Sequence, residues 1–146
     1  MVKRKLPKLK SLILKGNIPR HGDLQQYDDY TPIWSFKKID CGSKWCWNCL
    51  DPIIFKGTLQ KLKEIETQKW SQIKASKKLH HTIEVNNLTQ DAKSRLIKLQ
   101  YDELEELFSL HLGGKFRVYG IRVGVTLELL WFDKEHEIYP THKKHT

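Results

Sequence analysis

The sequence predicts an α+β fold in which a helical hairpin and a further helix pack on one face of an antiparallel sheet. Three segments place apolar residues at helical spacing: 58–67 and 68–76, which follow one another closely, and 88–100. Residues 107–133 alternate apolar and polar side chains in three runs, which Gly113-Gly114 and Val123-Gly124 separate. This alternation predicts a C-terminal three-stranded meander.

The chain is long enough for one domain, and we expect four segments along it. These are a basic arm and loop at 1–30, a Trp- and Cys-containing extension at 31–56 packed on the domain, the α+β domain at 57–140, and a basic tail at 141–146. A mobile arm and a short amphipathic helix both fit residues 1–20, which hold seven basic residues and no acid. The extension begins with a short strand at 33–36, after a loop at 22–32.

The helices are expected to begin at recognisable caps and to bury one apolar stripe each. Thr58 after Gly57 is a plausible N-cap for the first helix, whose buried side chains would be Leu59, Leu62 and Ile65. Trp70 and Ile73 continue the apolar face on the second helix, and the two form an αα-hairpin. A short strand at 82–85 precedes the third helix, at 88–100.

The register of the meander follows from keeping apolar residues opposite apolar residues. A three-residue loop at 113–115 pairs His111 with Arg117 and Leu110 with Val118. The second turn must contain two or four residues, and it then pairs Tyr119 with Glu128 and Val118 with Leu129. One face of the sheet is apolar and forms the core: Phe108, Leu110, Leu112, Phe116, Val118, Gly120, Leu127, Leu129 and Trp131. The other face is polar: Ser109, His111, Arg117, Tyr119, Thr126 and Glu128, with Leu130 and Phe132 towards one end.

The charge balance favours an anionic partner. Lys and Arg number 26 against 17 Asp and Glu, which gives a net charge of +9. A field of this sign attracts polyanions, so nucleic acid, the ribosome or an acidic protein is the expected partner. No apolar run approaches the ~20 residues that span a bilayer, so we expect no membrane association. No P-loop, G-x-G-x-x-G, H-E-x-x-H or G-x-S-x-G motif is present, which leaves nucleotide-dependent enzymes, zincins and serine hydrolases without support.

Three cysteines, Cys41, Cys46 and Cys49, are too few for a disulfide framework and indicate a reducing, cytoplasmic compartment. Their spacing contains one C-x2-C pair. A zinc site would need a fourth ligand, for which His21 and His80 are candidates. Buried free thiols are the alternative, and we expect no cofactor.

Two groups of polar side chains are candidates for function. The polar sheet face brings a histidine, an arginine, a tyrosine and a carboxylate within cross-strand distance, namely His111, Arg117, Tyr119 and Glu128, although such faces also occur without a function. Basic side chains that can contact nucleic acid are Lys115 and Arg122 in the meander, and Lys74, Lys77, Lys78, His80 and His81 around the second helix. For His80 and His81, a solvated helix end is the alternative interpretation.

The sequence predicts a helical hairpin, then a meander that contains Phe108-Ser-Leu-His-Leu-Gly-Gly-Lys-Phe-Arg-Val-Tyr-Gly-Ile-Arg122, and then a last strand that runs into Asp133-Lys-Glu-His-Glu-Ile-Tyr139. This order resembles the RelE/ParE-like toxin superfamily of bacterial toxin–antitoxin systems. The resemblance covers about residues 57–140. It implies a RelE-like fold and a small basic RNase that cuts mRNA in the ribosomal A site without a metal. Arg117 matches the central-strand arginine of that family and Tyr139 its C-terminal tyrosine, and His136 lies where a terminal basic residue often sits.

RNA cleavage by attack of the 2′-OH needs a base, a cation for the phosphorane and an acid for the leaving 5′-oxygen. We expect Arg117 to stabilise the charge and Lys115 to lie near RNA phosphates. His111 or Glu128 would be the base, and His136 or Tyr139 the acid. The expected partners are RNA or the ribosome and an acidic antitoxin, rather than a small molecule. The main alternative is a non-catalytic basic binding protein, encoded by a phage or mobile element. A third possibility is an inactive relative that only scaffolds an antitoxin.

Overall fold

The computed structural model describes residues 21–140, and the arm expected at 1–20 and the tail expected at 141–146 lie outside these residues. The strands are β1 (Ile33–Ser35), β2 (His81–Glu84), β3 (Glu106–His111), β4 (Arg117–Val123) and β5 (Thr126–Asp133). The α-helices are α2 (Pro52–Glu66), α3 (Trp70–Ala75) and α4 (Gln90–Lys98), and short 3₁₀ helices occupy His21–Tyr27, Trp47–Cys49 and Val85–Asn87. Part of the loop expected at 22–32 is therefore helical. No helix in residues 21–140 has the length and apolarity needed to cross a membrane.

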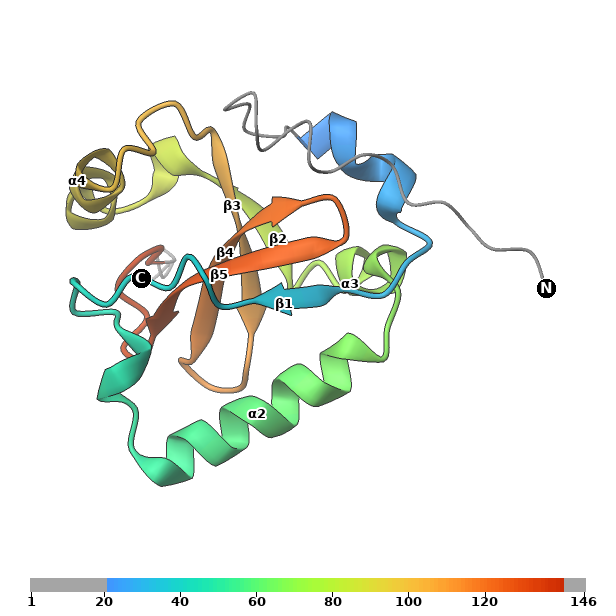
Figure 1. The fold of residues 1–146 in the computed structure, drawn as a ribbon, viewed down its shortest axis with the longest axis horizontal. Helices are drawn as coiled ribbons and strands as arrows, with labels where there is room; N and C mark the ends of the chain where they lie inside the picture. Colours follow the sequence, from blue (N-terminus) through green and yellow to red (C-terminus); the bar gives the residue numbers. More distant parts are fainter. Residues whose placement is uncertain (1–20, 141–146) are drawn as a thin grey trace, which may run out of the picture.

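The sheet has five strands in the order β1-β5-β4-β3-β2 (Figure 1). The α+β class is confirmed, but the sheet is mixed rather than antiparallel, because β1 runs parallel to β5. The long connection between these two strands permits a parallel pair, which a hairpin does not. Strand β1 thus completes the sheet instead of lying against it, and the boundary expected between residues 56 and 57 falls inside α2.

Helices cover both faces of the sheet, whereas the sequence predicted them all on one face. Leu62 of α2 and Trp70 of α3 pack with Leu110 on the first face. Leu96 of α4 packs with Trp131 and Tyr119 on the second. Figure 1 shows the sheet between α2 on one side and α4 on the other. The second face is therefore not the solvated polar surface that was expected: the side chains of Ser109 and Tyr119 are only 1% exposed.

Helix α2 begins six residues earlier than predicted, because its cap is Asp51 and not Thr58. The Asp51 carboxylate accepts a hydrogen bond from the Ile54 N–H at 2.9 Å, and Pro52 occupies the first turn, where a missing N–H costs nothing. Thr58 is buried inside the helix and donates its hydroxyl to the Ile54 carbonyl at 2.8 Å. Helices α3 and α4 lie within the predicted ranges 68–76 and 88–100.

The register between β3 and β4 matches the prediction: His111 pairs with Arg117 and Leu110 with Val118. The register between β4 and β5 does not. The turn is Gly124-Val125, with Val123 paired to Thr126, because Gly124 adopts the positive φ (65°) that Val123 would disfavour.

A β-bulge between Tyr119 and Gly120 shifts the remaining register of β5. Gly120 pairs with Leu129 but Tyr119 pairs with Trp131, so Leu130 is the extra residue. One extra residue reverses the faces beyond it. Trp131 therefore joins the second core, where Leu130 also lies, and Phe132 joins the first, opposite to the prediction.

Candidate active site

Four strand ends meet at one end of the sheet and bring polar side chains together. His111 ends β3 and faces Arg117, which begins β4, and Arg117 in turn faces Asp133 at the end of β5. His81, at the start of β2, faces Ser109 on β3. Directly opposed residues have Cα atoms about 4.5–5.5 Å apart, so His111, Arg117 and Asp133 are immediate neighbours, and His81 lies diagonally across from His111.

The segment after β5 turns back over this end of the sheet because Asp133 holds it. The fully buried Asp133 carboxylate accepts hydrogen bonds from the Glu137 N–H at 2.9 Å and the Ile138 N–H at 2.7 Å. Ile138 is itself buried, and its carbonyl accepts from the Thr89 N–H at 3.0 Å. The turn fixes His136, whose φ is 59°, and Tyr139 beside the strand ends.

His136 and Tyr139 are thereby brought to the same group as His111 and Arg117. His136 interacts electrostatically with both His111 and Asp133. The Tyr139 ring lies 6.4 Å from the ring of His81. Four of the five residues predicted for catalysis therefore gather here, and we name His81, His111, Arg117, His136 and Tyr139 the strand-end cluster.

Arg117 lies half-buried at the centre of the strand-end cluster, and the β3–β4 turn orients it. Its Nη1 donates to the Gly114 carbonyl at 2.7 Å and to the Phe116 carbonyl at 3.1 Å. The rest of the guanidinium retains donors for a phosphate group, since arginine carries five N–H bonds in a planar fork.

Burial and the neighbouring cation favour the neutral form of His81 and His111. Burial, followed by the Arg117 charge, lowers the pKa of both His81 and His111. His111 accepts the Gly113 N–H on Nδ1 at 3.2 Å. A neutral imidazole with an accepting Nδ1 carries its proton on Nε2, so His111 presents a hydrogen-bond donor.

His80, predicted to contact phosphate or solvent, does neither. It is 5% exposed, and its Nδ1 accepts the His111 N–H at 3.1 Å. Burial, with His111 and His81 nearby, lowers its pKa to about 4. His80 is thus a neutral side chain that holds the end of β3 in place.

Two buried groups lie beside the strand-end cluster: Tyr119, which the sequence placed on the same sheet face, and Asp133, which it did not place next to Arg117. Burial, with the Asp133 charge adding to it, raises the pKa of Tyr119, which shares a hydrogen bond with Ser109. Burial also raises the pKa of Asp133, while its backbone hydrogen bonds oppose the rise. Only the bulge, which has no clear sequence signal here, places Asp133 opposite Arg117.

Glu128, a predicted base, is not part of the strand-end cluster. It pairs with Ile121 and Ser35, and its carboxylate lies 3.4 Å from Lys37 Nζ. It lies five positions before Asp133 along β5, or about 16 Å of extended strand.

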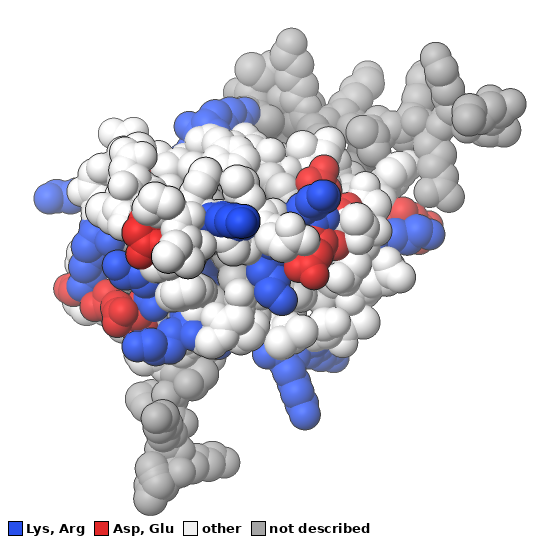
Figure 2. Space-filling model, turned by 90° about the horizontal axis from the view of Figure 1, so that it is seen from below, with Lys and Arg blue, Asp and Glu red and all other residues white. Residues whose placement is uncertain are grey.

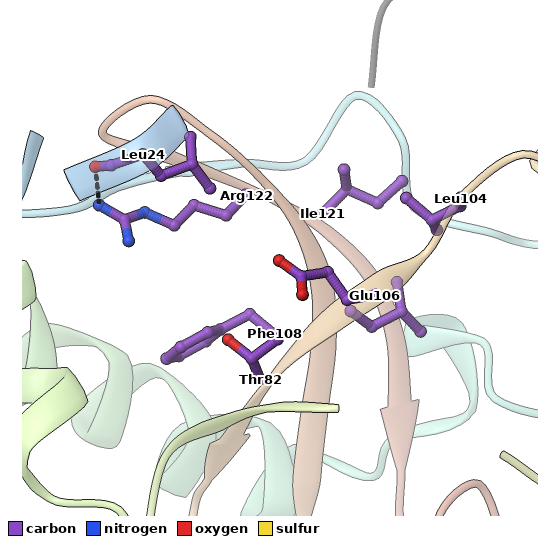
Figure 3. A pocket seen from close by; sticks show the side chains of 8 residues that line it. Leu24, Thr82, Leu104, Glu106, Phe108, Ile121 and Arg122 are labelled. Atoms are coloured by element: carbon purple, nitrogen blue, oxygen red, sulfur yellow. Dashed lines mark hydrogen bonds between the residues drawn. The ribbon is translucent and has the colours of Figure 1, made fainter. Parts of the chain in front are cut away.

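Arg122, predicted to contact nucleic acid, is a core residue with 6% exposure. Its guanidinium donates to the Leu24 carbonyl at 3.3 Å (Figure 3) and to Asp28 at 3.0 Å. The cavity beside it is about 20 Å³, which is room for one water molecule and not for a nucleotide.

The other predicted nucleic-acid contacts are lysines near the surface. Lys77 and Lys78 are exposed, and exposed Lys115 lies 3.5 Å from Glu135. Lys74 is bound to Asp28 at 2.8 Å. The face that includes α2 (Figure 2) carries acidic side chains among its Lys and Arg, so it is not a continuous basic patch.

The three cysteines lie in one loop but do not form a recognisable metal centre. Cys46 is buried and its Sγ accepts the Asn48 N–H at 3.3 Å, whereas Cys41 and Cys49 are exposed. Among the side chains that the structure describes, no group of three or more His, Cys, Asp or Glu is arranged to hold a metal ion, and the side chain of His21, one candidate fourth ligand, lies outside them.

Comparison of the chain with family models, with curated proteins and with solved structures gave no match.

Proposed function

We propose that this protein is an RNA-directed, metal-independent endoribonuclease of the toxin–antitoxin type. The observation that supports the proposal is the strand-end cluster, in which the Arg117 guanidinium lies among imidazole and phenol groups. Such a group supplies the positive charge and the proton carriers that phosphodiester cleavage needs. Ribosomal mRNA is the proposed substrate, and an acidic antitoxin the proposed protein partner.

In the proposed reaction the 2′-oxygen bonds to phosphorus and the bond from phosphorus to the 5′-oxygen breaks. Arg117 stabilises the charge on the phosphorane, and the Nε2–H of His111 donates to a phosphoryl oxygen. Glu128 is too distant and Nδ1 of His111 is occupied, so proton transfer falls to His136 and Tyr139. His136 accepts the 2′-OH proton, and Tyr139 gives a proton to the leaving 5′-oxygen.

The test is cleavage of a translated mRNA in a reconstituted translation system. Arg117→Ala is expected to lower the cleavage rate by about 10²-fold or more, and His136→Ala and Tyr139→Phe by about 10²-fold each. The products should end in 2′,3′-cyclic phosphate, and a 2′-deoxy nucleotide at the cut site should block the reaction. Glu128→Gln, on the same strand outside the strand-end cluster, is the matched control and should keep full activity.

Undiminished cleavage by both Arg117→Ala and His136→Ala would reject this active site.

A specific observation also favours the second candidate, a non-catalytic basic binding protein: His80 and His111 already use their Nδ1 atoms for backbone hydrogen bonds. RNA binding without product, in a protein whose expression does not slow growth, would establish that alternative.

A further inference from the structure

A cleft of about 360 Å³ lies between residues 43–45 and α4. Its lining shares no residue with the strand-end cluster. Three cationic side chains line it (Lys44, Arg95 and Lys98), together with two serine hydroxyls and the indole of Trp45. Asp91 is its one carboxylate. The lining is therefore rich in hydrogen-bond donors.

Arg95 is fixed in this cleft by a buried carboxylate. Asp40 accepts from Arg95 Nε at 2.8 Å and from Arg95 Nη2 at 2.6 Å. The Trp131 indole N–H and the Gly42 N–H donate to the same carboxylate, at 2.8 and 3.0 Å. These bonds use Nε and Nη2 of Arg95, so its Nη1 is not part of the ion pair with Asp40. The fold therefore holds the guanidinium of Arg95 in a fixed position in the lining of the cleft.

One of the residues that line the cleft, Trp45, carries an unsatisfied donor. The Trp45 side chain is 3% exposed, and its Nε1–H has no hydrogen-bond partner among the residues of the described structure. Burying such a donor unpaired is unfavourable, and because Trp45 lines the cleft its indole signal reports on a ligand that binds there.

We propose that this cleft binds the phosphate group of a nucleotide or of an RNA strand. Phosphate oxygens match the excess of donors and the fixed arginine edge. Lys44 now lies 3.5 Å from each of the Asp91 and Glu137 carboxylates, and a phosphate would compete with them for its ammonium group. No ion pair joins Lys98 to another described side chain, and in the proposed complex its ammonium group contacts the phosphate directly.

The cleft adjoins the turn that carries His136. The Trp45 carbonyl accepts the Phe132 N–H at 3.0 Å, one residue before Asp133, and Lys44 reaches Glu137. A strand whose phosphate occupies the cleft would therefore pass close to the strand-end cluster. The binding claim itself does not depend on cleavage.

The experiment is NMR titration of the full ¹⁵N-labelled chain, in which the Trp45 indole signal is identified by its loss in Trp45→Phe. The probes are inorganic phosphate, a nucleoside 5′-monophosphate and a 2′-O-methyl RNA hexamer that cannot be cleaved. At least one should shift the Trp45 indole signal saturably. Lys98→Glu should weaken that binding by about tenfold or more, because it reverses a charge at the cleft. Lys93→Glu, on the same helix but outside the cleft, is the matched control and should bind as the wild type does.

The three probes separate the two sources of phosphate. A response to phosphate or the monophosphate at low millimolar concentration identifies a free phosphate ligand, and a response to the hexamer alone identifies an RNA strand. The hexamer is also tested on Arg117→Ala, where the Trp45 shift should persist. Absence of a shift with all three probes, or equal affinities of Lys98→Glu and Lys93→Glu, would overturn the proposal.

Discussion

At the scale of single residues, the fold depends on charged side chains that are paired inside the core. Arg122 is the clearest case, with its guanidinium 4.1 Å from the centre of the Trp70 ring and bonded to the Leu24 and Gly124 carbonyls. The same guanidinium also forms an ion pair with Asp28 at 3.0 Å. One side chain thus ties the His21–Tyr27 helix and α3 to β4.

Replacing Arg122 should therefore cost more than any surface substitution. Arg122→Ala leaves the Leu24 and Gly124 carbonyls without this donor and Asp28 with Lys74 alone, and we expect the free energy of unfolding to fall by about 3–5 kcal/mol. Urea denaturation followed by tryptophan fluorescence measures this loss. Lys78→Ala, at an exposed site, should change stability by less than about 0.5 kcal/mol. Similar midpoints for the two variants would contradict the assigned role of Arg122.

His80 makes stability depend on pH. Burial lowers its pKa to about 4, whereas in the unfolded chain it titrates near the ordinary value of 6.5. Between these two pH values the unfolded state binds the proton and the folded state does not, so stability rises with pH across this window. We expect about 3 kcal/mol of stability to be lost as pH falls from about 6.5 to 4.

His80→Asn places an amide oxygen where Nδ1 accepts the His111 N–H, without a titrating group. Its unfolding free energy should therefore vary less than that of the wild type between pH 4 and 6.5, as measured by urea denaturation at a series of pH values. An unchanged pH dependence in His80→Asn would show that other groups cause the effect.

At the scale of elements, the bulge between β4 and β5 decides on which face of the sheet the last side chains of β5 lie. It places Asp133 opposite Arg117 and turns Trp131 towards the Asp40 carboxylate. Gly120 permits the bulge because a Cβ there would lie 2.7 Å from the Glu128 carbonyl oxygen. Such an approach is closer than a methyl group tolerates.

Two glycine substitutions should consequently have opposite effects on thermal stability. Gly120→Ala forces a backbone clash and is expected to destabilise the protein by about 1–3 kcal/mol. Gly57→Ala lies within α2, where a Cβ meets nothing within 4 Å, and it should stabilise the helix by up to about 1 kcal/mol. Calorimetry measures the melting temperature of both variants. A Gly120→Ala protein as stable as the wild type would show that close packing against Glu128 does not require glycine at position 120.

At the scale of the whole molecule, the net positive charge comes from the two ends of the sequence. Residues 1–20 and 141–146 together hold nine of the 26 basic residues and no acid, which leaves 17 basic and 17 acidic residues in 21–140. The described part of the chain is therefore neutral overall. Long-range attraction of a polyanion comes from the two ends, and the folded part supplies local contacts.

Matched triple substitutions test this division. Changing Lys3, Arg4 and Lys5 to Gln should reduce the slope of log affinity for single-stranded RNA against log salt by about 2, because each lost phosphate contact contributes about 0.7. Changing the exposed Lys56, Lys63 and Lys69 of the α2–α3 region to Gln should reduce the slope by less. Filter binding at several salt concentrations measures both, and equal slopes for the two variants would contradict the division.

Local signals in the sequence predicted much of the fold. The apolar spacing located α3 and α4, and the glycine pair at 113–114 gave the β3–β4 register. The same reasoning placed His111 next to Arg117, because adjacent strands joined by a short loop have few possible registers. It misjudged Arg122 and His80, since neither spacing nor residue type distinguishes a buried, paired cation or imidazole from a solvated one.

The sequence by itself determined the three helices, the three strands of the meander and the β3–β4 register, because periodicity and short turns act over a few residues. Only the tertiary structure decided which faces are buried, where the bulge lies and that Asp133 folds His136 and Tyr139 back towards Arg117. These outcomes depend on contacts between residues far apart in the chain. Their free energy comes from burying both faces of the sheet at once, which no local pattern records.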